Sequence, residues 1–130
     1  MTPEILNQTV ADSFGGARNF GEIVGQLIID EVEWYSANLR FGVSTFYAAD
    51  GSHHQTAWPS WRVLTIAEAF AADQVLAAIR ASQKGEHRYP EFLQKIAEAG
   101  CVYYTVHLQG RKAIYFGRHG DFYIEPFPQV

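Results

Sequence analysis

The sequence predicts an α+β domain that contains two copies of one α-α-β-β-β unit, with the helices on one side of an antiparallel sheet or of two packed sheets. Three observations support this prediction: the sequence aligns with itself at an offset of 69 residues, helix-capping patterns occur early in each copy, and alternating segments with turn glycines follow. The copies cover about residues 1–61 and 70–130, and the whole chain, 1–130, is expected to form a single domain.

The self-alignment needs no gap. Residues 1–61, placed on residues 70–130, give seven identical pairs, which are Ser13 with Ser82, Gly16 with Gly85, Glu22 with Glu91, Tyr35 with Tyr104, Leu39 with Leu108, Gly51 with Gly120, and Pro59 with Pro128. These pairs include turn glycines, a helix-capping glutamate and a closing proline, so the order of structural signals is the same in both copies. This agreement, more than the identities themselves, predicts an internal duplication.

Two helices are predicted at the start of each copy. In the second copy, Thr65 and Glu68 have the spacing of a capping box, which predicts a helix beginning there. Asn19 and Glu22 have the same spacing at the second helix of the first copy. Gly100 is expected to end the second helix of the second copy in a left-handed conformation.

Three strands are predicted after each pair of helices. Segment 101–108 alternates, with one face formed by Val102, Tyr104, Val106 and Leu108 and the other by Cys101, Tyr103, Thr105 and His107. Further strands are expected at about 43–48 and 53–58, and at 112–117 and 122–127. Asp50-Gly51 and His119-Gly120 have the composition of tight hairpin turns. Residues 59–64 are expected to link the copies.

Composition and charge argue against several classes of protein. The net charge of −4 and the pI near 5.7 argue against binding to nucleic acid, which requires clustered Lys and Arg. The single cysteine excludes an internal disulfide. The first residues lack the pattern of a signal peptide, and no apolar run reaches the ~20 residues of a membrane span, so a cytoplasmic location without membrane contact is expected.

No set of residues in the sequence has the spacing of a catalytic, metal or cofactor site. Cys101 and His107 lie on one predicted strand about 20 Å apart, which is too far for a nucleophile and its base. His53 and His54 are adjacent on a predicted strand and point to opposite faces. No zinc-ligand spacing and no phosphate-binding glycine motif is present. We therefore expect no catalytic residue, metal or cofactor.

One predicted surface repeats in both copies: the outer face of the first strand. It combines an aromatic residue with two polar residues in each copy, and its members are Trp34, Ser36, Asn38, Tyr103, Thr105 and His107. Aromatic surfaces with polar neighbours are typical of binding sites and dimer contacts, although the linker, a terminus or a second sheet would equally cover this face.

The chain also resembles a known family. The segment AIRASQKGEHRYPEFLQKIAEAGCVYYTVHLQGRKAIYFGRHGDFYIEPFP, with NFGEIVGQL and FYAADG of the first copy, is similar to a small bacterial family of uncharacterised proteins found in chromosomes and cryptic prophages, whose members often carry the name "phage envelope protein". The resemblance spans nearly the whole chain and implies a duplicated α+β fold. It implies no activity and no catalytic residue.

Three hypotheses follow. The first is a non-catalytic binding protein that contacts a protein partner or a small ligand through the aromatic sheet face, with a homodimer through that face as an expected form. The second is a small enzyme with a site between the copies, built from His53 or His54 with His107 or Cys101. The third, prompted by the genomic setting of the family, is a phage-derived regulator of a host protein.

Overall fold

The computed structural model describes residues 1–59 and 64–128, so the predicted linker falls mostly outside the described residues. In chain order the elements are α1 (Pro3–Gly15), α2 (Phe20–Ile29), β1 (Val32–Asn38), β2 (Val43–Ala48), β3 (His53–Ala57), α3 (Ala72–Gln83), α4 (Tyr89–Glu98), β4 (Cys101–His107), β5 (Lys112–Gly117) and β6 (Phe122–Pro126). Each element of the second half begins 69 residues after its counterpart in the first half. The predicted α+β class and element order are therefore confirmed.

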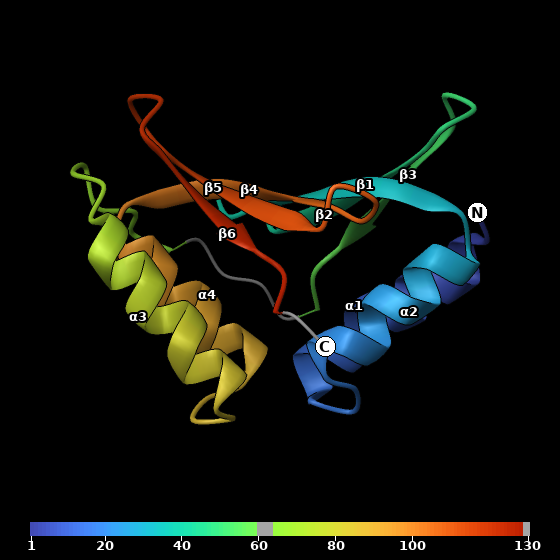
Figure 1. Ribbon diagram of the computed structural model, residues 1–130, viewed down its shortest axis with the longest axis horizontal. Helices are drawn as coiled ribbons and strands as arrows, with labels where there is room; N and C mark the ends of the chain where they lie inside the picture. Colours follow the sequence, from blue (N-terminus) through green and yellow to red (C-terminus); the bar gives the residue numbers. More distant parts are fainter. Residues whose placement is uncertain (60–63, 129–130) are drawn as a thin grey trace.

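The six strands form one antiparallel sheet with the order β3-β2-β1-β4-β5-β6. The two halves join at its centre, where β1 pairs with β4 from Trp34 opposite His107 to Asn38 opposite Tyr103. All four helices lie on one side of the sheet, as α1–α2 and α3–α4 hairpins that splay apart below it (Figure 1). The arrangement with two packed sheets is thereby excluded. We call the helix-covered side the inner face and the opposite side the outer face.

The hydrophobic core lies between the inner face and the helices, and it draws on both halves. Its largest fully buried side chains are Leu6, Leu27, Leu39, Leu93, Ile96, Val75, Val106 and Cys101. Burial of each leucine contributes roughly 2 kcal/mol. Because consecutive residues of a strand point to opposite faces, the same alternation that buries Tyr35 and Ala37 of β1 directs Trp34 and Ser36 to the outer face.

Helix ends are set by the predicted capping residues at two of three places. The Asn19 side chain accepts a hydrogen bond from the Glu22 N–H (2.9 Å), and the Asn19 N–H donates to the Glu22 carboxylate (3.0 Å), as expected for a capping box. Gly100 follows α4 with φ of +91°, which confirms the predicted left-handed conformation.

The prediction of a helix beginning at Thr65 and Glu68 is wrong, since α3 begins only at Ala72. The preceding segment is not helical, and its Ala71 N–H donates to the carbonyl of Ala99 (2.8 Å). The last carbonyl groups of a helix have no hydrogen-bond partner within the helix. The segment before α3 provides a partner for one of these carbonyls at the end of α4. A long-range backbone interaction therefore overrides the local capping pattern.

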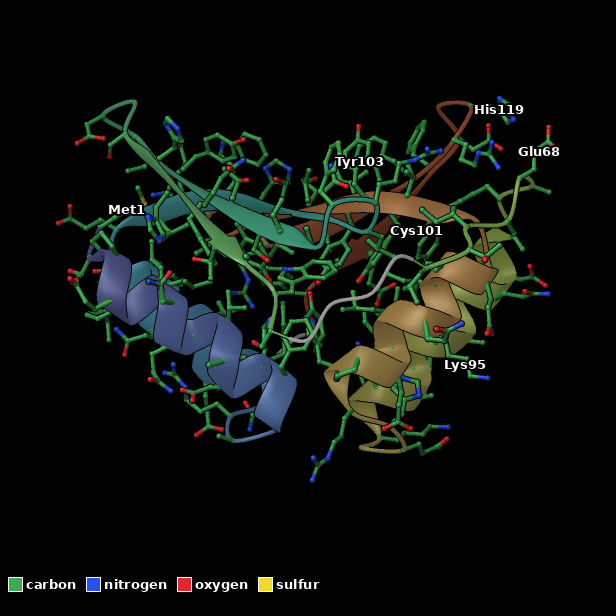
Figure 2. The ribbon with its side chains drawn as sticks, turned by 180° about the vertical axis from the view of Figure 1, so that it is seen from behind. Met1, Glu68, Lys95, Cys101, Tyr103 and His119 are labelled. Atoms are coloured by element: carbon green, nitrogen blue, oxygen red, sulfur yellow. The ribbon has the colours of Figure 1, made fainter. Side chains whose placement is uncertain are left out.

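The predicted face of Cys101 is also wrong, because a β-bulge shifts the alternation at the start of β4. Tyr103 pairs with Phe116 and Cys101 with Gly117, so two residues of β4 correspond to one of β5. Cys101 is consequently buried on the inner face, whereas Tyr103 points away from the helices (Figure 2). Cys101 and His107 thus lie on opposite faces.

Candidate functional site

The six residues predicted for the binding surface lie together on the outer face. They form three cross-strand pairs at the junction of the halves: Trp34 with His107, Ser36 with Thr105, and Asn38 with Tyr103. Their arrangement follows directly from the antiparallel register of β1 and β4. Asn38 has a structural role as well, because its side-chain oxygen accepts hydrogen bonds from the N–H groups of Arg40 and Phe41 in the following turn.

Aromatic rings stack in a row across the first half of the outer face. The Trp34 ring stacks on Tyr47 with centroids 4.1 Å apart, and on the other side it lies 5.6 Å from the His107 ring, nearly parallel to it. His53 continues the row beyond Tyr47. His107 is held by a hydrogen bond of 3.0 Å between its Nε2 and the Thr105 hydroxyl. We call these four side chains, Trp34, Tyr47, His53 and His107, the aromatic row.

The second half of the outer face carries an apolar patch in place of this row. Its members are neighbours across β4, β5 and β6, and they are Tyr103, Ile114, Phe116, Phe122 and Ile124. Tyr103 stacks on Phe116 at 4.6 Å. Tyr103, Phe122 and Ile124 are 38%, 61% and 43% exposed, respectively. A contiguous exposed patch of this kind is typical of an interaction surface.

The residues of the enzymatic hypothesis form no hydrogen-bonded pair with one another among the described residues. Cys101 is buried and donates its thiol to the Tyr103 carbonyl (3.4 Å), and burial raises the pKa of the thiol to about 12. His54 lies on the inner side with its Nε2 2.9 Å from the Asn7 side-chain oxygen of α1. His53 and His107 are on the outer face with two aromatic rings between them. The predicted divergence of His53 and His54 is confirmed.

Residues 1–59 and 64–128 contain neither a cluster of metal-binding side chains nor a membrane-spanning helix. No group of three or more histidine, cysteine, aspartate or glutamate side chains is placed to hold a metal ion in this part of the chain. Within the same residues, none of the helices combines the length and the apolar character that crossing a membrane requires.

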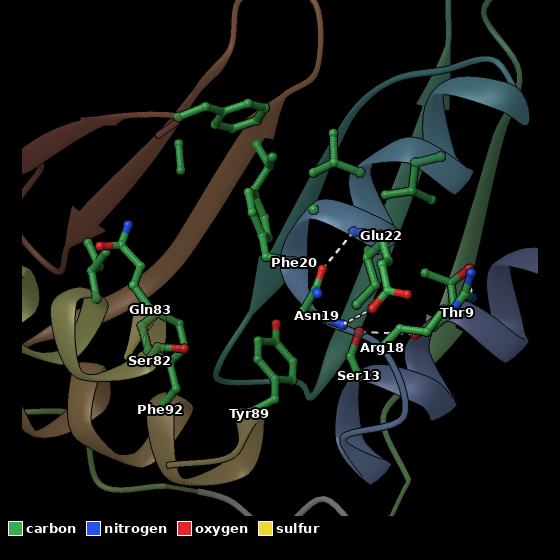
Figure 3. Close-up of a pocket in the computed structure, with 18 of the residues that line it drawn as sticks. Thr9, Ser13, Arg18, Asn19, Phe20, Glu22, Ser82, Gln83, Tyr89 and Phe92 are labelled. Atoms are coloured by element: carbon green, nitrogen blue, oxygen red, sulfur yellow. Dashed lines mark hydrogen bonds between the residues drawn. The ribbon is translucent and has the colours of Figure 1, made fainter. Parts of the chain in front are cut away.

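A cleft of about 1150 Å³ lies on the inner side, between the two helical hairpins and below the sheet (Figure 3). One wall is formed by the turn between α1 and α2 and by the first residues of α2, with Asn19, Phe20 and Glu22. The opposite wall comes from α3 and α4, with Gln83 and Phe92. The inner face of the central strands provides the floor.

The cleft is lined by corresponding residues of both halves, such as Ser13 with Ser82 and Phe20 with Tyr89, and one of its two corresponding ends is filled by aromatic rings. There α1 packs against α4, and three rings meet: Phe14 lies 5.7 Å from Trp58 and 5.2 Å from Tyr89. The counterparts of Phe14, Trp58 and Tyr89, 69 residues away, are Gln83, Phe127 and Phe20. Phe20 and Phe127 still touch edge to face at 5.4 Å, but the polar Gln83 stands where the third ring would be. We call these the sealed side and the open side.

Four tyrosines gather at the floor and inner wall of the cleft. The hydroxyls of Tyr89 and Tyr104 are hydrogen-bonded to each other. Tyr35 and Tyr115 are only 8% and 6% exposed and also line the cleft, yet neither hydroxyl has a hydrogen-bond partner among the described residues. Burial raises the pKa of all four phenols, so each remains a neutral O–H group at ordinary pH.

The guanidinium groups of two arginines that line the cleft have no carboxylate partner among the described residues. Arg111 has a φ of +54°, and the corresponding residue of the first half, Gly42, has a similar left-handed conformation. The Arg111 guanidinium lies 5.4 Å from the centroid of the Phe127 ring. Arg88 lines the cleft near the turn that follows α1. Arg18, by contrast, pairs with Asp12 at 2.9 Å.

Comparison with known proteins places this architecture in a family. The model of the family described as "Protein of unknown function (DUF1398)" matches residues 8–126, which include both sheet halves and most of the cleft lining. The chain belongs to this family.

Individual relatives of this DUF1398 protein are also uncharacterized. Protein Rv2012 of Mycobacterium tuberculosis and protein Mb2035 of Mycobacterium bovis are each 36% identical to it over 62 residues, which is 48% of this chain. The match covers 38% of the length of these curated relatives. Their names assign no activity, so the function has to be inferred from geometry.

Sequence reasoning predicted the outer face of this DUF1398 member but not its cleft. One available signal was the offset of 69 itself, because it aligns Phe14 with Gln83, an aromatic residue with a polar one, within otherwise similar helices. That difference carries meaning only once α1 and α4 are known to pack together, which the sequence does not show.

Proposed function

We propose that this protein is a non-catalytic binding protein that contacts another protein molecule through the outer face of its sheet. The observation that carries the proposal is the combination, on one face without helices, of the aromatic row and the apolar patch. Both include residues of the repeated surface predicted from the sequence, namely Trp34 with His107 and Tyr103. Aromatic residues dominate the energetics of protein interfaces because they bury large areas with few rotatable bonds.

The electrostatics of this face favour a weakly charged partner. The three cross-strand pairs at the centre of the outer face each continue across the other strands as a row of side chains. In these three rows, Lys112 is the one residue with a permanent charge, and it lies opposite His107. A face without carboxylates gives little attraction to a strongly basic partner, and a single lysine gives little to an acidic one. The face is therefore suited to an apolar and aromatic surface like its own.

A second copy of this chain is the partner that we propose. Two copies related by a two-fold axis bring the same patch together from both sides, and such an isologous contact requires no charge complementarity. The face spans six strands at ~4.8 Å and about five residues at ~3.3 Å, which is on the order of 500 Å² in projection. With rough side chains this approaches the ~800 Å² that each partner contributes to a standard interface.

The test compares the oligomeric state of the wild-type protein with that of two matched double variants. Sedimentation velocity over a range of protein concentrations measures it. The wild-type protein should form a dimer that Trp34→Ala/Tyr103→Ala converts to monomer with an unchanged circular dichroism spectrum. Ile28→Ala/Ile29→Ala removes two exposed isoleucines from α2 instead and should leave the dimer intact. Equal dissociation of both variants, or a monomeric wild-type protein at every concentration, would sink the proposal.

The other two hypotheses are less well supported. The enzymatic one used His53 or His54 with His107 or Cys101. Two aromatic rings separate His53 from His107 on the outer face, while His54 contacts Asn7 on the inner side and Cys101 is buried. The hypothesis of a phage-derived regulator rests on the genomic setting of the family that the sequence resembles. A monomeric wild-type protein that binds one host protein, with loss of binding in Trp34→Ala/Tyr103→Ala, would favour it over self-association.

We also infer that the halves arose by duplication of one α-α-β-β-β unit, giving a single domain with repeats at about 1–61 and 70–130. The constant offset of 69 residues between corresponding element starts supports this inference, as does the left-handed conformation at corresponding glycines such as Gly16 and Gly85.

A further inference from the structure

We infer that the cleft on the inner side is a binding site for a flat aromatic molecule that carries an oxygen acceptor group such as a carboxylate or sulfonate. This site lies on the opposite side of the sheet from the proposed dimer interface and is independent of it. Its volume of about 1150 Å³ lies slightly above the ~300–1,000 Å³ typical of small-molecule sites, so it has room for a ligand of that class.

The two tyrosine hydroxyls without partners are the observation that points to a ligand. Both side chains are more than nine-tenths buried, and their hydroxyl oxygens are not fully enclosed by protein, so they open into the cleft as donors for a bound molecule. Tyr35 and Tyr115 come from the inner face of β1 and β5, in different halves, and both line the same cleft. Oxygen acceptors of a molecule bound in the cleft would provide hydrogen-bond partners for these O–H donors. The neighbouring Tyr89 and Tyr104 hydroxyls already satisfy each other and are not required for this role.

The walls favour an aromatic body for the ligand. Phe46, Phe92 and the rings of the tyrosines surround the floor, and Phe20 and Phe127 stand at the open side. Phe92 lies edge-on to Tyr104 and Tyr115, with centroids 6.4 Å away in both cases. Rings arranged at different angles contact both the faces and the edges of a flat guest, and each such aromatic contact adds to the burial of its area.

The charges around the cleft favour an anionic group on the ligand. The guanidinium groups of Arg88 and Arg111 have no carboxylate partner among the described residues, while the lining carboxylates are engaged: Glu22 in its capping box and Glu125 with Arg80 at 2.6 Å. Arg111 also adopts a left-handed conformation, which costs about 1–2 kcal/mol outside glycine. The Arg111 guanidinium lies beside the Phe127 ring, which places a cation at the open side of the cleft.

The experiment uses two probes with the same aromatic body. 1-Anilinonaphthalene-8-sulfonate carries a sulfonate, whereas N-phenyl-1-naphthylamine does not, and both gain fluorescence in apolar sites. The sulfonate probe should bind the wild-type protein more tightly than its uncharged analogue. Tyr35→Phe/Tyr115→Phe should weaken the sulfonate probe by about tenfold or more, from the loss of two hydrogen bonds, and should leave the uncharged probe within about twofold.

A variant that closes the cleft gives the complementary result. Gln83→Phe supplies the ring that Phe14 supplies on the sealed side, so it should abolish binding of both probes while the protein stays folded. Trp34→Ala/Tyr103→Ala changes the outer face alone and should leave probe binding in the cleft unchanged, which separates this site from the proposed interface.

Either of two results would overturn the inference. One is unchanged affinity for the sulfonate probe in both Gln83→Phe and Tyr35→Phe/Tyr115→Phe. The other is loss of probe binding in Trp34→Ala/Tyr103→Ala, because that would place the probe on the outer apolar patch. The tyrosine variants keep the test decisive if Gln83→Phe fails to fold, since they remove hydroxyls that have no protein partner among the described residues.

Discussion

The two sides on which the helical hairpins approach each other have the same backbone plan and opposite outcomes. On the sealed side, Phe14 completes a group of three rings that joins α1 to α4. On the open side, Gln83 takes the corresponding place and a cleft remains. The difference teaches that, in a molecule with two similar halves, a site can be created by leaving one of two corresponding contacts unfilled.

The halves also differ at the residue that follows their second helix. Gly100 has φ of +91°, and its counterpart Glu31 adopts φ of +65° despite its side chain. A Cβ atom at Gly100 would lie 2.3 Å from the carbonyl oxygen of Ala69, because the segment before α3 packs against it.

The largest expected effect sharpens this second difference. Gly100→Ala should destabilise the protein by about 3 kcal/mol or more, because it adds a backbone clash to the cost of a left-handed non-glycine residue. The midpoint and slope of guanidinium unfolding measure the change. Glu31→Ala is the matched control and should alter stability by less than about 1 kcal/mol. A similar loss in both variants would contradict the role assigned to the Ala69 contact.

The next effect concerns the sealed side. Phe14→Gln should cost about 2–3 kcal/mol, since it removes a ring from contact with Trp58 and Tyr89 and places a polar group there. Thermal and urea unfolding check the value. The reverse change, Gln83→Phe, should leave stability unchanged or raise it by up to about 1 kcal/mol. If Phe14→Gln were neutral, ring packing would not be what closes that side.

A smaller effect appears at alkaline pH and is concentrated in the second half. Burial raises the pKa of Tyr89, Tyr104, Tyr115 and Cys101 there, and of Tyr35 alone among the corresponding first-half residues. The unfolded chain loses protons above the ordinary values of 9.0 for the thiol and 10.0 for the phenols while the folded protein keeps them, so stability is complete below pH 9 and falls as the pH rises.

Single variants measure this dependence. Tyr115→Phe should reduce the loss of stability between neutral pH and about pH 10.5 by ~0.8 kcal/mol, the contribution of one phenol that ionises only after unfolding. Denaturant titrations at both pH values give the difference. Phe46→Tyr, at the corresponding position of β2, should steepen the loss in the same way. An identical pH dependence in Tyr115→Phe and wild type would show that this phenol ionises equally in both states.

Much of the fold was predictable because its signals are local. The Asn19–Glu22 capping box, the alternation of β4 and the turn at Asp50-Gly51 each lie within a few residues of sequence, and the structure places helices and strands accordingly. The start of α3 and the face of Cys101 were mispredicted for the opposite reason. Both are set by neighbours distant in sequence, the end of α4 in one case and the β5 register in the other.

The candidate sites divide in the same way. The six outer-face residues could be grouped from strand alternation and the offset between the copies, and the central β1–β4 pairing then brought them together. The cleft residues could not be grouped, because they come from nine elements and the turns between them. That the hydroxyls of Tyr35 and Tyr115 have no hydrogen-bond partner among the described residues can be seen only from the three-dimensional positions of the surrounding side chains.

The central pairing of β1 with β4 has a consequence for how the chain reaches this structure. Within each half, the meander strands pair with the next strand in the chain, whereas the β1–β4 ladder joins residues about 69 positions apart. Local contacts form early and distant ones late, so each half is expected to present an unpaired strand edge before the halves meet. The same edge on a second chain is an equally good partner, and during refolding the chain concentration therefore decides between closed monomers and strand-exchanged assemblies.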